Sequence, residues 1–470
     1  MAAGSTRRVL QQLRDYESRN VTFMAPDGSW PVVWAGARGC RVRDVEGRTY
    51  LDLTAAFGVA AAGHANPRVV AAGRRQMGVL LHAMGDVHPH PLKAELARAL
   101  SEITFGRWGS SRRARAAGRP RRGKVIFTNS GFEAVEAALK TALLATGRPG
   151  VLAFGGAYHG LGYGALNATH REHFRGPFRP QLREFTRFIG YPGCSRCACA
   201  GPGCGDLARV EAEVRREFAM ARPGAILVEP VQARGGIHVP PQGFLPLLRR
   251  LADEAGALLV LDEIYTGFGR TGAWFATEHS GTVPDLVCLG KALTGGFPLS
   301  ACVGSAEVMD HAWPPSDGEA IHTSTFLGHP VGCAMALAQL GEIDRLGLVE
   351  RSAGLGDHLL GLLNQLAAGA WPWQLRVRGQ GLMAGLEVLD ASGVPQAPVA
   401  LAAIQRLLAR GFLFLPEGDP ASVISFTPPL TIARRDLERS VAALESVLRD
   451  LAALPPGGQT APAGKRRVRR

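Results

Sequence analysis

Short apolar runs recur between residues 124 and 305 and alternate with longer stretches in which the apolar residues have helical spacing. Strands that are apolar throughout, rather than at every second residue, are typical of a sheet covered on both faces. This part of the chain therefore predicts an α/β domain with a mainly parallel central sheet. The predicted strands are 125–127, 151–154, 225–228, 257–261, 286–289 and 301–303, and the clearest predicted helices are 132–146, 206–220 and 243–256.

The two ends of the chain have a different pattern. Residues 30–60 alternate apolar and polar positions in the manner of half-exposed strands, whereas 331–455 mixes helices with short strand candidates. We therefore expect a smaller α+β domain built from both chain ends. The predicted division is 1–66 and 312–455 for this small domain, 67–311 for the large α/β domain, and 456–470 for a disordered basic tail.

The chain has the size of an enzyme, with 470 residues of which 46% are apolar. Its net charge of +13 raises the alternative of a nucleic-acid binder. Most of that charge lies in two segments, residues 104–123 with seven arginines and no acidic residue, and 465–470 with five basic residues. Both are poor in apolar residues, so we expect solvated surface there and no nucleic-acid partner.

Targeting and metal binding leave weaker traces in the sequence. Residues 1–20 lack the apolar core of a signal peptide, and no run of eighteen uncharged apolar residues occurs, so we expect a cytoplasmic protein that does not enter a membrane. Four of the eight cysteines cluster as Cys194, Cys197, Cys199 and Cys204. Such thiolates can hold zinc or an iron–sulfur cluster, but their spacing is tighter than in a two-knuckle zinc site. A loop of reduced thiols is the simpler interpretation, and no metal is predicted.

Polar and small residues gather where the predicted strands end. Because the carboxyl ends of parallel strands meet at one edge of a sheet, where ligands bind in open α/β folds, these residues are expected to share one pocket. The segments are Asn129-Ser130-Gly131, Gly155-Gly156-Ala157-Tyr158-His159-Gly160, Glu229-Pro230, Asp262-Glu263 and Gly290-Lys291.

Lys291 points to a specific chemistry. The chain has 48 arginines but only five lysines, so a need for positive charge does not by itself explain a lysine here. A lysine can lose its proton and act as a nucleophile, whereas an arginine in a protein stays charged. A desolvated pocket or a nearby cation lowers the lysine pKa from about 10.4 far enough for Schiff-base formation. The alternative is a lysine that caps the strand or contacts a phosphate, although no P-loop sequence is present.

A lysine Schiff base needs an aldehyde partner, and pyridoxal 5′-phosphate makes three further demands that the strand ends meet. Its phosphate needs an anion site, which Ser130 and Gly131 offer at the start of a predicted helix. Its pyridine nitrogen needs a buried carboxylate such as Asp262, and its ring needs a flat partner such as Tyr158. Taken singly, Asp262 has the alternative of a helix cap and Tyr158 that of a core residue. Together they fit one ligand.

Several long motifs surround these residues and occur in one order. With Lys291 they resemble the class III pyridoxal-phosphate-dependent aminotransferases, a family that includes the ornithine, acetylornithine and 4-aminobutyrate aminotransferases. The resemblance extends over about residues 36–450 of this chain. The motifs are GCRVRD at 39–44, NSGFEA at 129–134, AYHG at 157–160, EPVQ at 229–232, LDEIYTGFGRTG at 261–272 and HTSTF at 322–326.

The resemblance implies a fold-type I architecture and a homodimer whose active sites lie at the subunit interface. It also implies transfer of an amino group from an amino acid or amine to a 2-oxo acid or aldehyde, by a ping-pong mechanism through a Lys291 Schiff base. Lys291 and Asp262 are the predicted catalytic residues, and Phe57 and Arg234 the predicted substrate residues. The positions assigned to the cofactor are Ser130, Gly131, Tyr158, His159, Glu229, Gln232, Asp262, Ile264, Lys291 and, from the neighbouring subunit, Thr325.

Three charged positions of the family are changed in this chain. The Glu that follows Gln-Gly in the ornithine and 4-aminobutyrate enzymes is Arg234, its partner Arg is Ser425, and the Arg after His-Gly is Leu161. A dicarboxylate acceptor such as 2-oxoglutarate is therefore not expected unless Arg234 anchors the carboxylate itself. The same loss keeps open an alternative on the same fold, an amino-acid racemase, epimerase or aminomutase, which needs no acidic second substrate.

Overall fold

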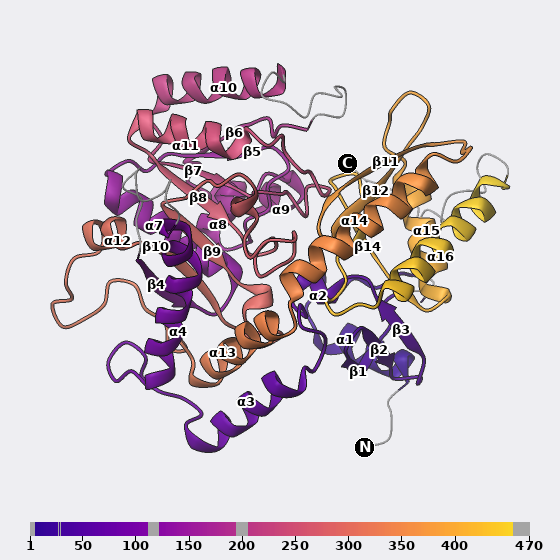
Figure 1. The fold of residues 1–470 in the computed structure, drawn as a ribbon, viewed down its shortest axis with the longest axis horizontal. Helices are drawn as coiled ribbons and strands as arrows, with labels where there is room; N and C mark the ends of the chain where they lie inside the picture. Colours follow the sequence, from indigo (N-terminus) through magenta and orange to yellow (C-terminus); the bar gives the residue numbers. More distant parts are fainter. Residues whose placement is uncertain (1–4, 27, 29, 111–121, 194–204, 455–470) are drawn as a thin grey trace.

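A seven-stranded sheet forms the centre of the protein in the computed structural model, which describes residues 5–26, 28, 30–110, 122–193 and 205–454 (Figure 1). The strand order is β4-β10-β9-β8-β7-β5-β6. β10 is antiparallel to both β4 and β9, and the other neighbours are parallel. The bounds are β4 (Gly123–Thr128), β5 (Val151–Phe154), β6 (Thr186–Ile189), β7 (Ala225–Val228), β8 (Leu258–Asp262), β9 (Leu286–Leu289) and β10 (Ser300–Ser305).

The sheet is covered on both faces because alternate residues of each apolar strand enter two separate cores. Leu152 and Phe154 of β5 belong to the core that includes Phe244 of α11. Val151 and Ala153 of the same strand belong to the core that includes Ala138 of α7. This double burial explains why the strands are apolar at every position, and it confirms the predicted α/β class.

Helices supply the layers on either side of the sheet and most of the second half of the chain. None of the helices in the described part of the chain is both long enough and apolar enough to cross a membrane. The helices are α1 (Thr6–Tyr16), α2 (Ala55–Gly58), α3 (Pro67–Val79), α4 (Pro91–Ser101), α5 (Arg107–Gly109), α7 (Gly131–Thr146), α8 (Tyr163–Ala168), α9 (Glu172–Arg175), α10 (Gly205–Ala221), α11 (Phe244–Ala255), α12 (Ala306–Ala312), α13 (Pro330–Arg345), α14 (Leu348–Ala367), α15 (Ala397–Ala409) and α16 (Arg434–Ala452).

Two four-stranded sheets lie beside the central one and combine the two ends of the chain. In the first, β13 (Phe412–Leu413) pairs in parallel with β3 (Thr49–Asp52), next to β2 (Arg41–Asp44) and β1 (Trp34–Arg38). Figure 1 accordingly places the indigo β1–β3 beside the yellow α15 and α16. The second sheet has the order β11-β12-β15-β14, with β11 (Gln374–Gln380), β12 (Met383–Leu389), β15 (Val423–Phe426) and β14 (Leu415–Glu417).

The exact domain boundaries remain a prediction. α13 follows the proposed boundary at residue 312, yet it packs mainly against α3 and α4. One strand was missed from sequence: β6 is an edge strand of four residues that includes the exposed Arg187, so its apolar signal is short and interrupted. The expectation of solvated surface over 104–123 is wrong for its first residues, because Phe105 and Trp108 are buried in the core. Residues 111–121 of that segment, the cysteine cluster and the basic tail lie outside the described residues, so the predictions for them stay open.

A close glycine contact fixes α14 against the turn between β11 and β12. A Cβ atom on Gly356 of α14 would lie 2.3 Å from the carbonyl carbon of Gly381 in that turn. Gly381 has φ +59°, and a Cβ there would lie 2.3 Å from the carbonyl carbon of Thr271, which follows β8 of the central sheet. The second half of the chain therefore approaches the large sheet at a distance that only glycine permits.

We predict that Gly356→Ala destabilises the protein by roughly 1–3 kcal/mol, because the methyl group meets backbone that cannot rotate away. Gly361→Ala is the matched control in the same helix, since a Cβ at Gly361 meets nothing within 4 Å. The control should gain ~0.5–1 kcal/mol from the better helix former. Urea denaturation of both variants measures the difference, and equal stabilities would contradict the proposed packing.

Candidate active site

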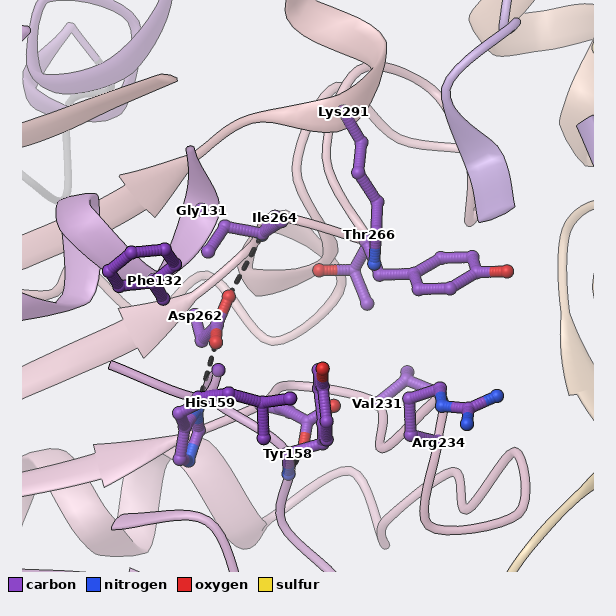
Figure 2. Close-up of a pocket in the computed structure, with 14 residues that line it drawn as sticks. Gly131, Phe132, Tyr158, His159, Val231, Arg234, Asp262, Ile264, Thr266 and Lys291 are labelled. Carbon is purple, nitrogen blue, oxygen red and sulfur yellow. Dashed lines mark hydrogen bonds and ion pairs between the residues drawn. The ribbon is translucent and has the colours of Figure 1, made fainter. Parts of the chain in front are cut away.

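A cavity of about 420 Å³ lies at the carboxyl ends of the central strands. Asp262 is the last residue of β8, Glu229 follows β7 directly, and Lys291 comes two residues after the end of β9. Gly131, the first residue of α7, lines the same cavity. Figure 2 shows Lys291 on one side and Tyr158 on the other, with Asp262 between Ile264 and His159. The structure thus brings together strand ends that lie up to 160 residues apart in the sequence.

The side chain of Lys291 is half-buried, and its amine is unusually easy to deprotonate. Burial lowers the pKa of Lys291 to about 8, although the nearby carboxylates of Asp262 and Glu229 oppose this shift. The nitrogen lies 3.6 Å from the ring centre of Tyr265, so an aromatic face lies next to the amine in the place of water. The backbone of Lys291 has φ +41°, a left-handed conformation that a non-glycine residue adopts only when the surroundings enforce it. The amine is therefore held in place and partly uncharged near neutral pH.

Asp262 is fixed by two partners. Its Oδ2 lies 2.8 Å from Nδ1 of His159, and its Oδ1 accepts a hydrogen bond of 3.1 Å from the backbone N–H of Ile264. His159 is itself buried, and its Nε2 has no hydrogen-bond partner among the described residues. The carboxylate is therefore oriented by groups behind it while it still borders the cavity.

Glu229 supports the loop that carries Tyr158. Its two oxygens accept hydrogen bonds from the backbone N–H groups of Tyr158 at 3.0 Å and Ala233 at 3.3 Å. Burial raises the pKa of Glu229 to about 7, and the two N–H groups oppose this shift. The carboxyl group thus joins the chain segments after β5 and β7 at the cavity.

The start of α7 offers a smaller set of donors than its sequence suggests. Glu133 already accepts the backbone N–H groups of Asn129 at 2.7 Å and Ser130 at 2.9 Å. The first N–H groups of the helix have no partner within the helix, and these begin at Gly131. The Ser130 hydroxyl is buried and, within the described part of the chain, without a hydrogen-bond partner. A polar group left unpaired in this way is suited to a ligand oxygen.

Four predicted site residues do not line this cavity: Ser130, Gln232, Phe57 and Thr325. Gln232 lies behind it, buried, with its amide donating to the carbonyl of Gly155 at 2.9 Å. Phe57 is 49% exposed and lines a separate apolar cavity of about 300 Å³ together with Trp30. Thr325 lies on the surface of the segment between α12 and α13. The last two do not border the cavity of their own chain.

Arg234 lines the cavity and has a partner that sequence did not reveal. Its Nη1 donates to Oε2 of Glu417 at 3.0 Å, and Glu417 is only 2% exposed. Glu417 ends β14, 183 residues further along the chain, so no local pattern identifies it. Tyr265 and Thr266 also line the cavity. They belong to the motif at 261–272, in which only Asp262 and Ile264 were predicted to be site residues.

The model of the family described as "Aminotransferase class-III" matches residues 23–448 of this chain. The chain belongs to the class III aminotransferases. Its predicted amino-transfer activity is therefore confirmed, and the alternative of a racemase, epimerase or aminomutase is not favoured.

Named relatives agree with this family assignment. The acetylornithine aminotransferase of Methanopyrus kandleri is 37% identical over 89% of this chain and 95% of its own length. The putrescine aminotransferase of Pectobacterium atrosepticum is 35% identical over 96% of this chain and 90% of its own length. A solved amine transaminase from an uncultivated Pseudomonas species, in a pyridoxal-phosphate-bound form, has a TM-score of 0.81 and 28% identity over 93% of this chain and 98% of that one. The predicted fold-type I architecture is confirmed by this likeness.

We predict that Lys291 of this aminotransferase titrates well below an ordinary lysine. In ligand-free protein, reductive methylation of Lys291 should increase as the pH rises through about 8, because only the uncharged amine reacts. Lys124, which is half-exposed and paired with Asp310, is the internal control. Peptide mass spectrometry at each pH measures both sites. Parallel titration of the two lysines would contradict the desolvation of Lys291.

Proposed function

We propose that this aminotransferase uses pyridoxal 5′-phosphate in the cavity between Lys291 and Tyr158, and takes amines or amino acids as donors and 2-oxo acids or aldehydes as acceptors. One observation supports the proposal most strongly. The desolvated amine of Lys291 and the buried, oriented carboxylate of Asp262 line the same cavity. The pyridoxal-phosphate-bound form of a solved relative and the substrates in the relatives' names support it.

The residues present fit this cofactor. The unpaired hydroxyl of Ser130 and the start of α7 at Gly131 suit its phosphate, since both supply donors where the helix dipole favours an anion. Asp262 suits a protonated pyridine nitrogen, and Tyr158 and Ile264 supply the two faces between which a flat ring packs. His159, Glu229 and Gln232 would act from behind, through the hydrogen bonds that hold Asp262, Tyr158 and Gly155.

When bound, the cofactor supplies an aldehyde that accepts an amino group and a ring that withdraws electrons from the substrate carbon. The protein's own contribution is to place and move protons. Lys291 has a pKa of about 8, so its amine can both take up and release a proton near neutral pH. His159 holds the carboxylate of Asp262 in place where it borders the cavity. The ring of Tyr265 lies against the amine and excludes water from that side.

We further propose that the protein is a homodimer with shared sites. Thr325 and Phe57 are predicted site residues that do not reach the cavity of their own chain, so a second copy is needed to supply one or both. The segment from the end of α3 to residue 87 exposes apolar side chains that a dimer interface would cover. They are Met77, Val79, Leu80, Leu81, Met84 and Val87.

Replacement of Lys291 tests the function itself. Lys291→Ala should lose the violet-region absorbance of the bound cofactor and slow amino transfer by at least ~10²–10⁴-fold, because the proton carrier is gone. Lys291→Arg should fail in the same way, since an arginine keeps its proton. Lys140→Ala is the matched control, an exposed lysine on α7 beside His322. A Lys291→Ala variant with full turnover would refute the assignment, as would borohydride treatment that leaves no pyridoxyl group on the Lys291 peptide.

The dimer makes a separate prediction. The double variant Val79→Asp, Leu81→Asp should sediment as a monomer and lose most activity, because two charges would have to be buried in the interface. Met220→Asp is the control, a 70% exposed apolar residue on α10 far from α3 (Figure 1). It should leave both the sedimentation coefficient and the activity unchanged. A wild-type protein that sediments as an active monomer would overturn this part of the proposal.

A further inference from the structure

The charged groups of the cavity are not equally available to a substrate. Four of them line it: Glu229, Arg234, Asp262 and Lys291. Both oxygens of Glu229 accept backbone N–H groups, and both oxygens of Asp262 have partners as described above. Lys291 is assigned to the chemistry. Arg234 is therefore the charged group of this lining that remains to meet a group of the substrate other than the reacting amine.

Arg234 has donors to spare. Its Nη1 is bound to Glu417, and among the described residues its other guanidinium nitrogens make no hydrogen bond. The guanidinium carbon lies 5.9 Å from the ring centre of Tyr158, another residue of the cavity lining. A guanidinium presents N–H groups in a planar fork that matches the two oxygens of a carboxylate.

The segment that carries Glu417 is docked onto Arg234 in several ways. The backbone N–H of Gly418 donates to the carbonyl of Arg234 at 3.1 Å. One residue further, Asp419 pairs with Arg171 at 2.8 Å. The carboxylate of Glu417 is thus held beside Arg234 by backbone contacts as well as by the ion pair itself.

We propose that Glu417 is a specificity-determining residue, a fixed counter-charge that lets the Arg234 subsite accept a substrate carboxylate in one half-reaction and an uncharged substrate end in the other. This inference rests on the proposed function, because amino transfer brings two different substrates to one site in turn.

The two effects of Glu417 on binding have opposite signs. A carboxylate that binds Arg234 meets the negative charge of Glu417 close by, so Glu417 weakens the binding of acidic substrates. An uncharged substrate end instead removes water from Arg234, and without Glu417 it would leave an unpaired charge in a closed site. Glu417 therefore strengthens the binding of uncharged substrates.

Shape-matched donors separate these effects. We suggest 4-aminobutyrate with 4-methylpentan-1-amine, and alanine with 3-methylbutan-2-amine, because an isopropyl group replaces the carboxylate in each pair. The measured quantity is kcat/KM for the first half-reaction of the holoenzyme, followed through the absorbance of the bound cofactor. Wild type should accept both members of at least one pair.

Glu417→Gln should raise kcat/KM for the carboxylate member about tenfold and lower it for the isopropyl member about tenfold, which is about 1.4 kcal/mol in each direction. Arg234→Gln should lower it about 100-fold for the carboxylate member alone. Glu417→Asp keeps the charge and should restore the wild-type ratio in part. Asp450→Asn is the control, because it removes an ion pair with Arg410 at a carboxylate that is 51% exposed and outside the cavity; its ratio should not change.

A shift of both members in the same direction in Glu417→Gln, with the thermal stability unchanged, would overturn the inference, because it would make Glu417 merely structural. Wild type that accepts only one member of every pair would overturn the inference too, and would leave the proposed amino transfer standing. Wild type that reacts with none of the four donors and shows no cofactor absorbance would overturn the proposed function and this inference together.

Discussion

The site depends on removing the ammonium group of Lys291 from water. A charged amine in a buried cavity is costly, and the protein meets this cost partly by letting the amine lose its proton, with a pKa of about 8, and partly by surrounding it with Asp262, Glu229 and the ring of Tyr265. Carboxylates alone would keep the lysine protonated. Apolar walls alone would lower its pKa but would not hold the amine at a defined place in the cavity. The balance between the two makes the amine a usable base near neutral pH.

The central sheet sets that balance. β8 and β9 are parallel neighbours in a register that places Asp262 opposite Cys288, so Asp262 and Lys291 leave the sheet at the same edge. β7 adds Glu229 on the other side of β8. Because every residue of these three strands except the half-buried Leu258 is buried, the strands cannot slip without exposing apolar residues to water. The fixed register of these strands thus holds Glu229, Asp262 and Lys291 in defined positions relative to one another.

The charges of the cavity come as partnered units. Asp262 has His159, Glu229 has backbone N–H groups, and Arg234 has Glu417, so each charge is oriented before any ligand arrives. The family pair that joins the residues at positions 234 and 425 is absent here, and a different pair of opposite polarity occupies this side of the cavity. Ser425 instead donates its hydroxyl to the carbonyl of Leu415, two residues before Glu417, and helps to order the strand pair that carries it.

The local sequence pattern was enough to predict most strands of the central sheet, the α/β class, and the candidate roles of Lys291 and Asp262. This is because a buried strand is a run of consecutive apolar residues, and the polar residues at its end follow it directly in the sequence. It was not enough for the short edge strand β6, or for Glu133, which occupies the N–H of Ser130. Only the folded chain decided that Arg234 meets Glu417 and that Phe57 and Thr325 lie away from the cavity of their own chain. These features depend on contacts between segments far apart in the sequence, which are set by packing and leave no periodic trace along the chain.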